Sequence, residues 1–174
     1  GLLAYGFDSG AAFYFGYVSS ILELNSVIIK NCTAEGYGGG GVFYEPAQFN
    51  VYVYANNCIF TNNRAFYGGI AMYGRWMAKN CTFFNNSTVG TGGISYYCYF
   101  DGINSIFTGN SGPEPVFSTP PMTPNMTYSL IQTNGFVSGT GNISGEPIFI
   151  STDEASANWL HLDGGSCGID SGTP

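Results

Sequence analysis

Charged residues are scarce in this chain of 174 residues, and basic residues are the scarcest of all. Only 9% of the residues are charged, and four Lys or Arg stand against eleven Asp or Glu, so the formal net charge is −7. Such an acidic chain repels nucleic acids and anionic membrane surfaces. No apolar run approaches the roughly 20 residues that a membrane helix needs. The composition therefore argues against nucleic-acid partners and against a membrane span.

The chain also lacks an initiator Met, and its first residues, "GLLAYGFDSG", lack the basic start of a signal peptide. We therefore expect a mature or excised piece of a protein. Residues that favour helices are underused, whereas Gly, Asn, β-branched and aromatic residues are abundant. This composition is typical of short strands joined by tight turns. The sequence thus predicts one all-β domain.

Nearly the same seven letters recur as "NCIFTNN" at 57–63, "NCTFFNN" at 80–86 and "NSIFTGN" at 104–110, with a partial copy, "NCTAEGY", at 31–37. Their first Asn residues lie 23 to 26 residues apart. A second pattern runs out of phase with the first: "GGVFY" begins at 40, "GGIAM" at 68 and "GGISY" at 92, and "GAAFY" at 10 is a degraded copy. Units of this length with only short strands match the coils of a parallel β-helix. An antiparallel sandwich, the main alternative, would not place the same letters at corresponding corners.

In a stack of coils, residues at matching positions of the repeat lie directly above one another. Side-chain alternation along "NCTFFNN" puts Cys81, Phe83 and Asn85 on the inner face. The flanking Asn residues are expected at a turn, in the left-handed conformation, with each amide bonded to the Asn of the next coil. The predicted stacks are Cys32, Cys58 and Cys81; Phe60, Phe83 and Phe107; and Asn63, Asn86 and Asn110.

The repeat letters resemble a known family. "GGIA" (68–71) and "GGIS" (92–95), with "FTNN", "FFNN" and "FTGN", look like the GGA-I and F-x-x-N repeats of polymorphic outer-membrane proteins. "YSLI" (128–131), "GNISGEPIF" (141–149), "LHL" (160–162) and "GGSCGIDSG" (164–172) are similar to the closing segment of exported bacterial and archaeal β-helix proteins. The resemblance implies a right-handed parallel β-helix in an extracellular or cell-surface setting. It implies no single activity. About six to seven coils of this unit length would fit in the chain.

The expected organisation is a single domain with three parts. Residues 1–110 form coils, the Pro-rich stretch 111–127 is an irregular loop folded over them, and residues 128–174 form the last coils and the closing segment.

The five cysteines allow two interpretations. Neighbouring coils lie about 4.8 Å apart, within the Cα range of a disulfide, but parallel stacked side chains meet its torsion poorly. We favour a file of buried thiols, with disulfides as the alternative. Cys98 and Cys167 lie outside the file and are the candidates for a bond to another chain.

Glycosylation sequons are numerous, as expected of an exported protein, although an Asn-, Ser- and Thr-rich chain also contains sequons by chance. The candidate acceptors are Asn31, Asn80, Asn85, Asn86, Asn125 and Asn142.

Catalytic chemistry has little support in the sequence. The acidic residues are dispersed, and the single histidine, His161, lacks a Cys or acidic partner at a ligand spacing. We expect no catalytic, metal or cofactor site. A polysaccharide lyase or hydrolase is the least favoured function.

Runs of aromatic residues, such as "NVYVYAN" (50–56) and "YYCYF" (96–100), must push about half of their side chains outwards by strand alternation. The exposed candidates Tyr52, Tyr54, Tyr97 and Tyr99 would stack on sugars, contact another protein or pack under the 111–127 loop.

The chain begins inside the repeat pattern. An uncovered coil edge presents unpaired backbone groups, which can pair with a second copy of the chain. The sequence therefore predicts an extracellular structural protein that assembles with itself into a filament, sheath or surface layer. The alternative is an adhesin or glycan-binding module with glycan or cell-surface receptor partners.

Overall fold

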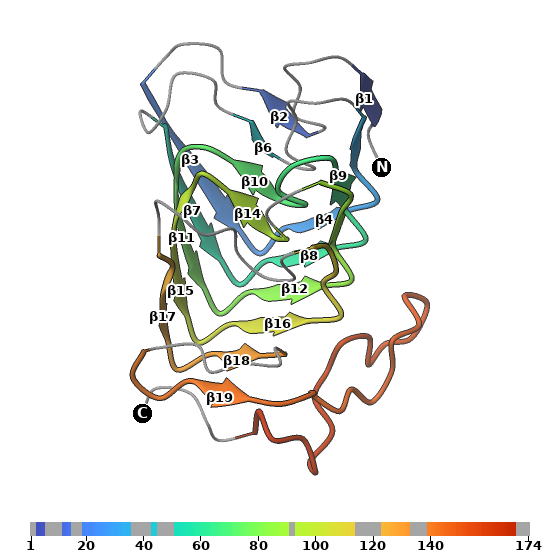
Figure 1. Cartoon of the computed structure of the whole chain (residues 1–174). Coiled ribbons are helices and arrows are strands. Elements are labelled where there is room, and N and C mark those ends of the chain that lie inside the picture. The colour runs from blue at the N-terminus through green and yellow to red at the C-terminus, as the bar shows by residue number, and fades with distance from the viewer. Residues whose placement is uncertain are drawn as a thin grey trace.

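The computed structural model describes residues 3–5, 12–14, 19–35, 43–44, 51–90, 93–113, 123–132 and 139–169. Within these ranges all named strands pair in parallel and none of the residues is helical, so the fold is all-β and of a β-solenoid-like class (Figure 1). The described residues accordingly offer no helix that could cross a lipid bilayer.

The strands form four parallel sheets. Sheet A contains β1 (Leu3–Tyr5), β5 (Thr33–Glu35), β9 (Arg64–Ala65) and β13 (Ser87–Thr88). Sheet B contains β2 (Phe13–Tyr14), β6 (Phe43–Tyr44), β10 (Ala71–Met72) and β14 (Ser95–Tyr96). Sheet C contains β3 (Ser20–Asn25), β7 (Val51–Asn56), β11 (Arg75–Lys79), β15 (Tyr99–Ile103) and β17 (Asn125–Thr127). Sheet D contains β4 (Ile28–Lys30), β8 (Ile59–Thr61), β12 (Thr82–Phe84), β16 (Ile106–Thr108), β18 (Leu130–Ile131) and β19 (Ile143–Ser144).

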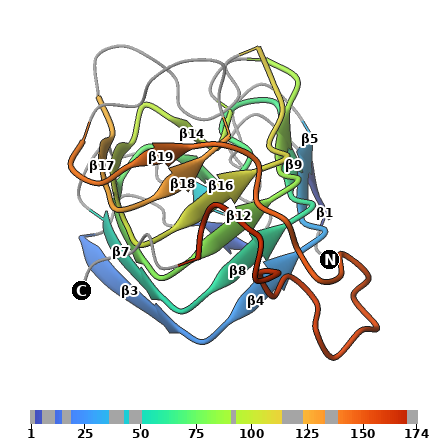
Figure 2. The ribbon, with the colours of Figure 1, turned by 90° about the horizontal axis from the view of Figure 1, so that it is seen from below.

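From β2 to β16 the named strands follow the sheet order B, C, D, A and then start the next level, as in β10, β11, β12 and β13. We call one such passage a rung. Seen from below, sheets A, C and D border a common interior (Figure 2). Each rung lies on its neighbour in register: Phe83 pairs with Phe60 on one side and with Phe107 on the other. Matching letters in the sequence are therefore vertical neighbours in the structure.

Two corners of each rung use the left-handed backbone conformation. Between sheets C and D the left-handed residues are Ser26, Asn57, Asn80, Asn104 and Tyr128. Between sheets D and A they are Asn31, Asn62, Asn85 and Gly109. Asn and Gly tolerate this conformation better than other residues, which explains why Asn recurs at these places. The left-handed residue thus precedes each Asn of the predicted ladder, so that part of the prediction is wrong. The same turn leaves Asn85 exposed instead of inside.

Aromatic rings fill the interior. Phe60, Phe83 and Phe107 lie in one stack, with centroids 4.9 and 4.7 Å apart and nearly parallel planes. Trp76 and Phe100 stack beside them at 6.1 Å, and Trp76 meets Phe60 edge-on. All five rings are buried. The predicted Phe stack is confirmed, and it forms the centre of the core.

A ladder of Asn side chains runs beside the rings, with Asn63 and Asn86 buried and Asn110 half-buried. Asn63 donates its main-chain and side-chain N–H groups to Oδ1 of Asn86, and Asn86 donates in the same way to Oδ1 of Asn110. The amides of Asn86 and Asn110 also donate to the main-chain oxygens of Phe60 and Phe83, both at 2.9 Å. The predicted ladder of Asn63, Asn86 and Asn110 is therefore present, and it satisfies polar groups that would otherwise be buried without partners.

Cys32 does not belong to the cysteine file. Because Ile29 pairs with Phe60, Cys32 lies opposite Asn63, and its main-chain N–H donates to Asn63 Oδ1 at 3.0 Å. In its rung, Cys32 therefore occupies the place that Asn63 occupies in the next rung of the Asn ladder. The file of small side chains is instead Val27, Cys58, Cys81, Ser105 and Ser129. The letters "NCT" at 31–33 do not mark the repeat here, because the matching corner between sheets C and D lies at Ser26, five residues before Asn31.

The expected loop over 111–127 is too long at both ends. Ser111 forms a bridge with Ser87, and Asn125–Thr127 is strand β17, which pairs with β15. Residues 114–122 lie outside the described ranges. Both ends of the Pro-rich stretch therefore belong to the stack.

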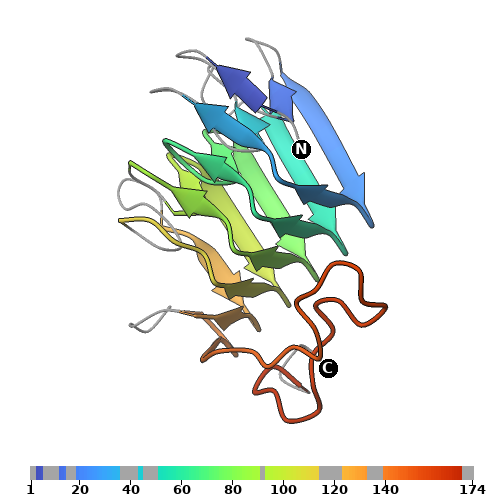
Figure 3. The ribbon, with the colours of Figure 1, turned by 90° about the vertical axis from the view of Figure 1, so that its right-hand side faces the viewer.

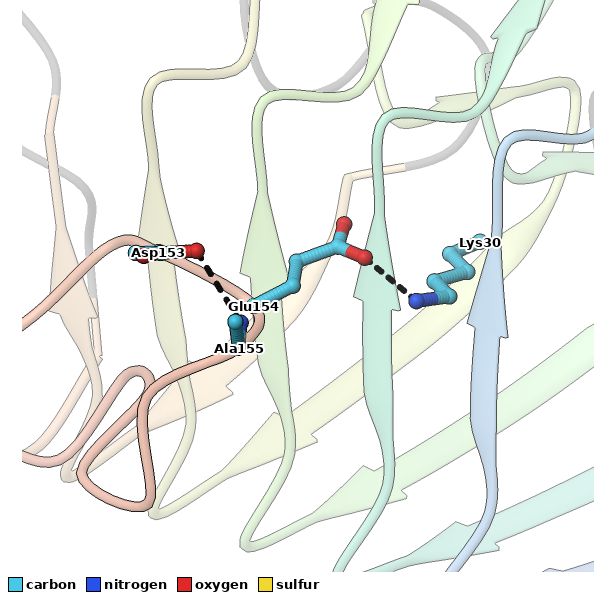
Figure 4. Close-up of polar contacts among 4 residues, drawn as sticks. All are labelled: Lys30, Asp153, Glu154 and Ala155. Atoms are coloured by element: carbon cyan, nitrogen blue, oxygen red, sulfur yellow. Dashed lines mark hydrogen bonds and ion pairs between the residues drawn. The ribbon is translucent and has the colours of Figure 1, made fainter.

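The last part of the chain departs from the expected coils. Beyond β19, residues 145–169, which we call the C-terminal segment, contain only the isolated bridges Phe149 with Leu162 and Ser151 with Trp159. Figure 3 shows it as an orange and red loop beside the stacked strands. Phe149 contacts Phe84 of β12 edge-on at 5.6 Å. Glu154 forms an ion pair with Lys30 of β4 (Figure 4). The segment covers part of sheet D instead of extending the stack.

Candidate binding face on sheet C

The outer face of sheet C results from strict alternation. In β7, Val51, Val53 and Ala55 are buried, whereas Tyr52 and Tyr54 point outwards. In β11, Trp76 and Ala78 are buried, whereas Arg75, Met77 and Lys79 are exposed. A one-residue slip would reverse both faces, so the buried core fixes which side chains the surface displays.

Register aligns the outward side chains into rows. One row, the tyrosine–arginine row, consists of Ile21, Tyr52, Arg75 and Tyr99. Ile21 is 67% exposed, Tyr52 40% and Tyr99 42%. Large apolar surface is usually withdrawn from water, so a row this exposed is a candidate contact surface.

Arg75 lies between the two tyrosines. Its guanidinium carbon is 4.7 Å from the ring centroid of Tyr99 and 5.7 Å from that of Tyr52. Both distances are within the range of a cation–π contact. Within the described ranges Lys30 forms an ion pair with Glu154, whereas Arg75 forms no ion pair. The stacking holds the guanidinium against the face while its N–H donors stay available.

A second row, the acidic row, runs alongside. It contains Glu23, Tyr54, Met77, Asp101 and Asn125. Together the two rows line an open groove whose walls include Tyr52, Tyr54, Arg75, Met77, Tyr99 and Asp101. Trp76 and Phe100 support it from inside, where their rings stack. The groove therefore combines aromatic faces, a multiple donor and a carboxylate acceptor on a rigid base.

The predicted contact residues divide between two places. Tyr52 and Tyr99 lie in the tyrosine–arginine row, and Tyr54 is half-buried in the acidic row. Tyr97 lies at the corner before β15, with a φ of 50°, where its ring is 6.0 Å from that of Tyr73. The structure therefore brings three of the four tyrosines onto one face.

Sequence reasoning missed Arg75 and Asp101. Arg75 lies 23 residues after Tyr52 and 24 before Tyr99, which are spacings of the repeat itself. The signal lies in the strand that precedes each heptad. Extending the same alignment backwards would have placed Arg75 between the tyrosines.

All five cysteines are free thiols, which supports the thiol interpretation over disulfides. The Sγ atoms of Cys58 and Cys81 donate to the main-chain oxygens of Leu24 and Ala55. Burial raises the pKa of Cys81 to about 12. With this pKa the thiol of Cys81 is unreactive at neutral pH.

Cys98 was expected to be available for a bond to another chain, and this is wrong. Its side chain is buried, and burial, followed by the charge of Asp101, raises its pKa. Cys167 is exposed.

The sequon residues fall into two groups. Asn31, Asn80, Asn85 and Asn125 are exposed, whereas Asn86 is buried in the ladder and Asn142 is half-buried. Within the described ranges no cluster of three or more His, Cys, Asp or Glu side chains has the arrangement of a metal site.

Comparison of the chain with protein-family models, with curated proteins and with solved structures found no match.

Proposed function

We propose that this protein is an extracellular, non-enzymatic glycan-binding module, built as a right-handed parallel β-helix of about six to seven coils. The sheet order repeated from β2 to β16 and the parallel register support the β-helix. The resemblance to polymorphic outer-membrane proteins, which stays a prediction, favours the cell surface. In this proposal the rungs are the rigid support, and the outer face of sheet C is the working surface.

The observation that carries the proposal is Arg75 stacked between Tyr52 and Tyr99 on an open face. Sugar rings present flat C–H faces that pack on exposed aromatic rings, and their hydroxyls need donors and acceptors nearby. Arg75 supplies the donors and Asp101 supplies the acceptor. Tyr52 and Tyr99 are two strands apart, about 9.6 Å, which suits a ligand of two or more linked rings.

Charge favours an uncharged glycan. Glu23 and Asp101 lie on the same face as Arg75, and the whole chain carries a formal charge of −7. These carboxylates disfavour uronic or sialic acids electrostatically. We therefore assign a neutral glycan to the groove.

Hydrolysis of that glycan does not fit the face. Paired glycosidase carboxylates lie about 5–10 Å apart. Glu23 and Asp101 are on β3 and β15, with β7 and β11 between them, which separates their strands by about 14 Å. The two acids flank a binding surface instead of a scissile bond.

A glycan array followed by calorimetry tests the proposal. The protein should bind a neutral glycan of at least two rings, and Tyr52→Ala or Tyr99→Ala should abolish that binding. Tyr97→Ala is the matched control, since Tyr97 is also exposed but lies outside the row. Binding that survives both row variants, or a failure to bind any neutral glycan, contradicts the proposal.

Self-assembly into a filament, sheath or surface layer is the second candidate. The observation that favours it is that, besides Ile21, three isoleucines are more than half exposed: Ile28, Ile148 and Ile150, at 52%, 53% and 53%. Apolar side chains this exposed promote association. Electron microscopy of concentrated protein should then show filaments or sheets that Ile148→Ser with Ile150→Ser disperses. Discrete monomers at every concentration would argue against assembly.

A further inference from the structure

The six sequon asparagines differ in whether the side-chain nitrogen is free to carry a sugar. N-glycosylation joins Nδ2 of Asn to the sugar. An Asn whose Nδ2 is buried and hydrogen-bonded in the native fold cannot carry that bond without losing native contacts. Burial and hydrogen bonding therefore sort the sequons, independently of the glycan-binding function proposed above.

Two of the sequons are closed by the fold. Nδ2 of Asn86 donates to the main-chain oxygen of Phe60 at 2.9 Å and to Oδ1 of Asn110 at 3.0 Å, and the residue has no exposed surface. Nδ2 of Asn142 donates to the main-chain oxygen of Met126 at 2.9 Å, while its Oδ1 accepts from the main chain of Ser129. A sugar at either site would displace a rung.

The other four sequons are open. Asn31 and Asn85 lie at the corner between sheets D and A, Asn80 lies at the corner between sheets C and D, and Asn125 lies on the outer face of sheet C. All four are exposed, and their side chains form no hydrogen bond with the described part of the chain.

We propose that Asn80 and Asn85 are N-glycosylation sites, that Asn31 and Asn125 are open to the same modification, and that Asn86 and Asn142 stay unmodified in the folded protein. In the transfer, Nδ2 bonds to the anomeric carbon of a sugar from a lipid-linked oligosaccharide diphosphate. The bond from that carbon to the diphosphate oxygen breaks, the lipid diphosphate leaves, and Nδ2 loses one proton. The sugars project from the edges between sheets.

The sequence 85–88, "NNST", makes the inference sharp, because two overlapping sequons stand side by side. Asn85-Asn86-Ser87 has an exposed acceptor, and Asn86-Ser87-Thr88 has a buried one. By sequence alone both Asn85 and Asn86 are acceptors, whereas in the folded protein only Asn85 is accessible. Ser87→Ala removes the sequon of Asn85 alone, and Thr88→Val removes that of Asn86 alone.

The experiment is secretion of the full chain from a eukaryotic host that glycosylates sequons. The folded, secreted protein is isolated, deglycosylated enzymatically in heavy-oxygen water and mapped by peptide mass spectrometry. Each asparagine that carried a sugar then becomes a labelled aspartate. We expect the label at Asn80 and Asn85, and none at Asn86 or Asn142.

The two matched variants complete the test. Ser87→Ala should lower the intact mass by one glycan, and Thr88→Val should leave the number of glycans unchanged. Thr88 is buried, and its Oγ1 has no hydrogen-bond partner among the described residues, so valine fits there. Sugar on Asn86 or Asn142 in folded protein, or none on Asn80 and Asn85, overturns the proposal.

Discussion

Asn63 donates two hydrogen bonds to a single atom of Asn86: its main-chain N–H reaches Oδ1 at 3.1 Å and its side-chain amide reaches the same Oδ1 at 3.0 Å. The two residues are 23 positions apart in the sequence and belong to neighbouring rungs. The contact repeats between Asn86 and Asn110. It ties each rung to the next inside the stack, where water does not compete.

Replacing Asn86 should therefore destabilise the fold strongly. Asn86→Ala removes the acceptor of the main-chain N–H of Asn63 and of one of its two side-chain bonds, since that amide also donates to the oxygen of Ile29. It also removes the side-chain donor to the main-chain oxygen of Phe60. Each orphaned buried group costs about 1–3 kcal/mol, so we expect the free energy of unfolding to fall by about 3 kcal/mol or more. Urea titration followed by fluorescence measures it. Asn85→Gly is the control, because Asn85 is exposed and Gly109 occupies its place in the next rung; equal losses in the two variants would contradict the ladder.

The ring stack should be as sensitive. Phe83 lies between Phe60 and Phe107 and is fully buried. Phe83→Ala removes both stacked contacts and leaves a cavity, which costs about 3–5 kcal/mol. Thermal unfolding monitored by circular dichroism should show a large drop in Tm. Tyr97→Ala, at an exposed corner, should change stability by only about 0.5 kcal/mol. Similar melting of the two variants would show that Phe83 is not in the core.

Alkaline pH should loosen the fold through the buried thiols. Burial raises the pKa of Cys81 from 9.0 to about 12. Above pH 9 the unfolded chain releases this proton while the folded chain keeps it. The folded state then binds more protons, so the free energy of unfolding decreases as the pH rises from about 9 to about 12. Cys81→Ser should flatten part of this slope, since Ser105 occupies the same place in the next rung. An unchanged slope in that variant would rule out Cys81 as the cause.

Arg75 should matter to the glycan site by its shape as well as its charge. A guanidinium stacks on tyrosine rings and offers a fork of donors, which the ammonium of lysine does not. We expect Arg75→Lys to weaken glycan binding about tenfold, which corresponds to about 1.4 kcal/mol. Calorimetry measures the affinity, and circular dichroism checks that the fold is unchanged. Full affinity in Arg75→Lys would mean that charge alone suffices.

The ion pair between Lys30 and Glu154 should contribute little. Both side chains are more than a third exposed, and exposed pairs are typically worth about 0–1 kcal/mol. Glu154→Gln should thus leave the midpoint of urea unfolding almost unchanged. Phe149→Ala should cost more, because Phe149 attaches the C-terminal segment to Phe84 by an apolar contact. A larger loss of stability in Glu154→Gln than in Phe149→Ala would contradict this account of how the C-terminal segment is attached.

The interior of the stack was largely predictable from the sequence. The letters around Phe60, Phe83 and Phe107 are nearly the same, since equal positions in a stack face equal surroundings. The first rung was misaligned for the opposite reason. Ser26, Val27 and Ile29 hold the places of Asn57, Cys58 and Phe60. The backbone conformation is therefore the same in the two rungs, whereas the residue types differ. The pairing of β4 with β8, in which Ile29 lies opposite Phe60, reveals the true register.

The outer face and the C-terminal segment were less accessible. Arg75 contacts Tyr52 and Tyr99 across strands, so its role depends on register in sheet C and on no local motif. The C-terminal segment has no repeat, because it packs on the outside of sheet D through contacts such as that of Phe149 with Phe84. Alternation and periodicity cannot predict contacts of this kind.

The central claim, that successive rungs lie directly on one another, can be measured through its ring stack. In protein with isotope-labelled phenylalanine, nuclear Overhauser spectra should connect the ring protons of Phe83 with those of both Phe60 and Phe107, whose centroids lie 4.9 and 4.7 Å away. No direct cross-peak should join Phe60 to Phe107, since these rings are two rungs apart, about 9.6 Å. Absence of both contacts of Phe83 in folded protein would contradict the stacked architecture.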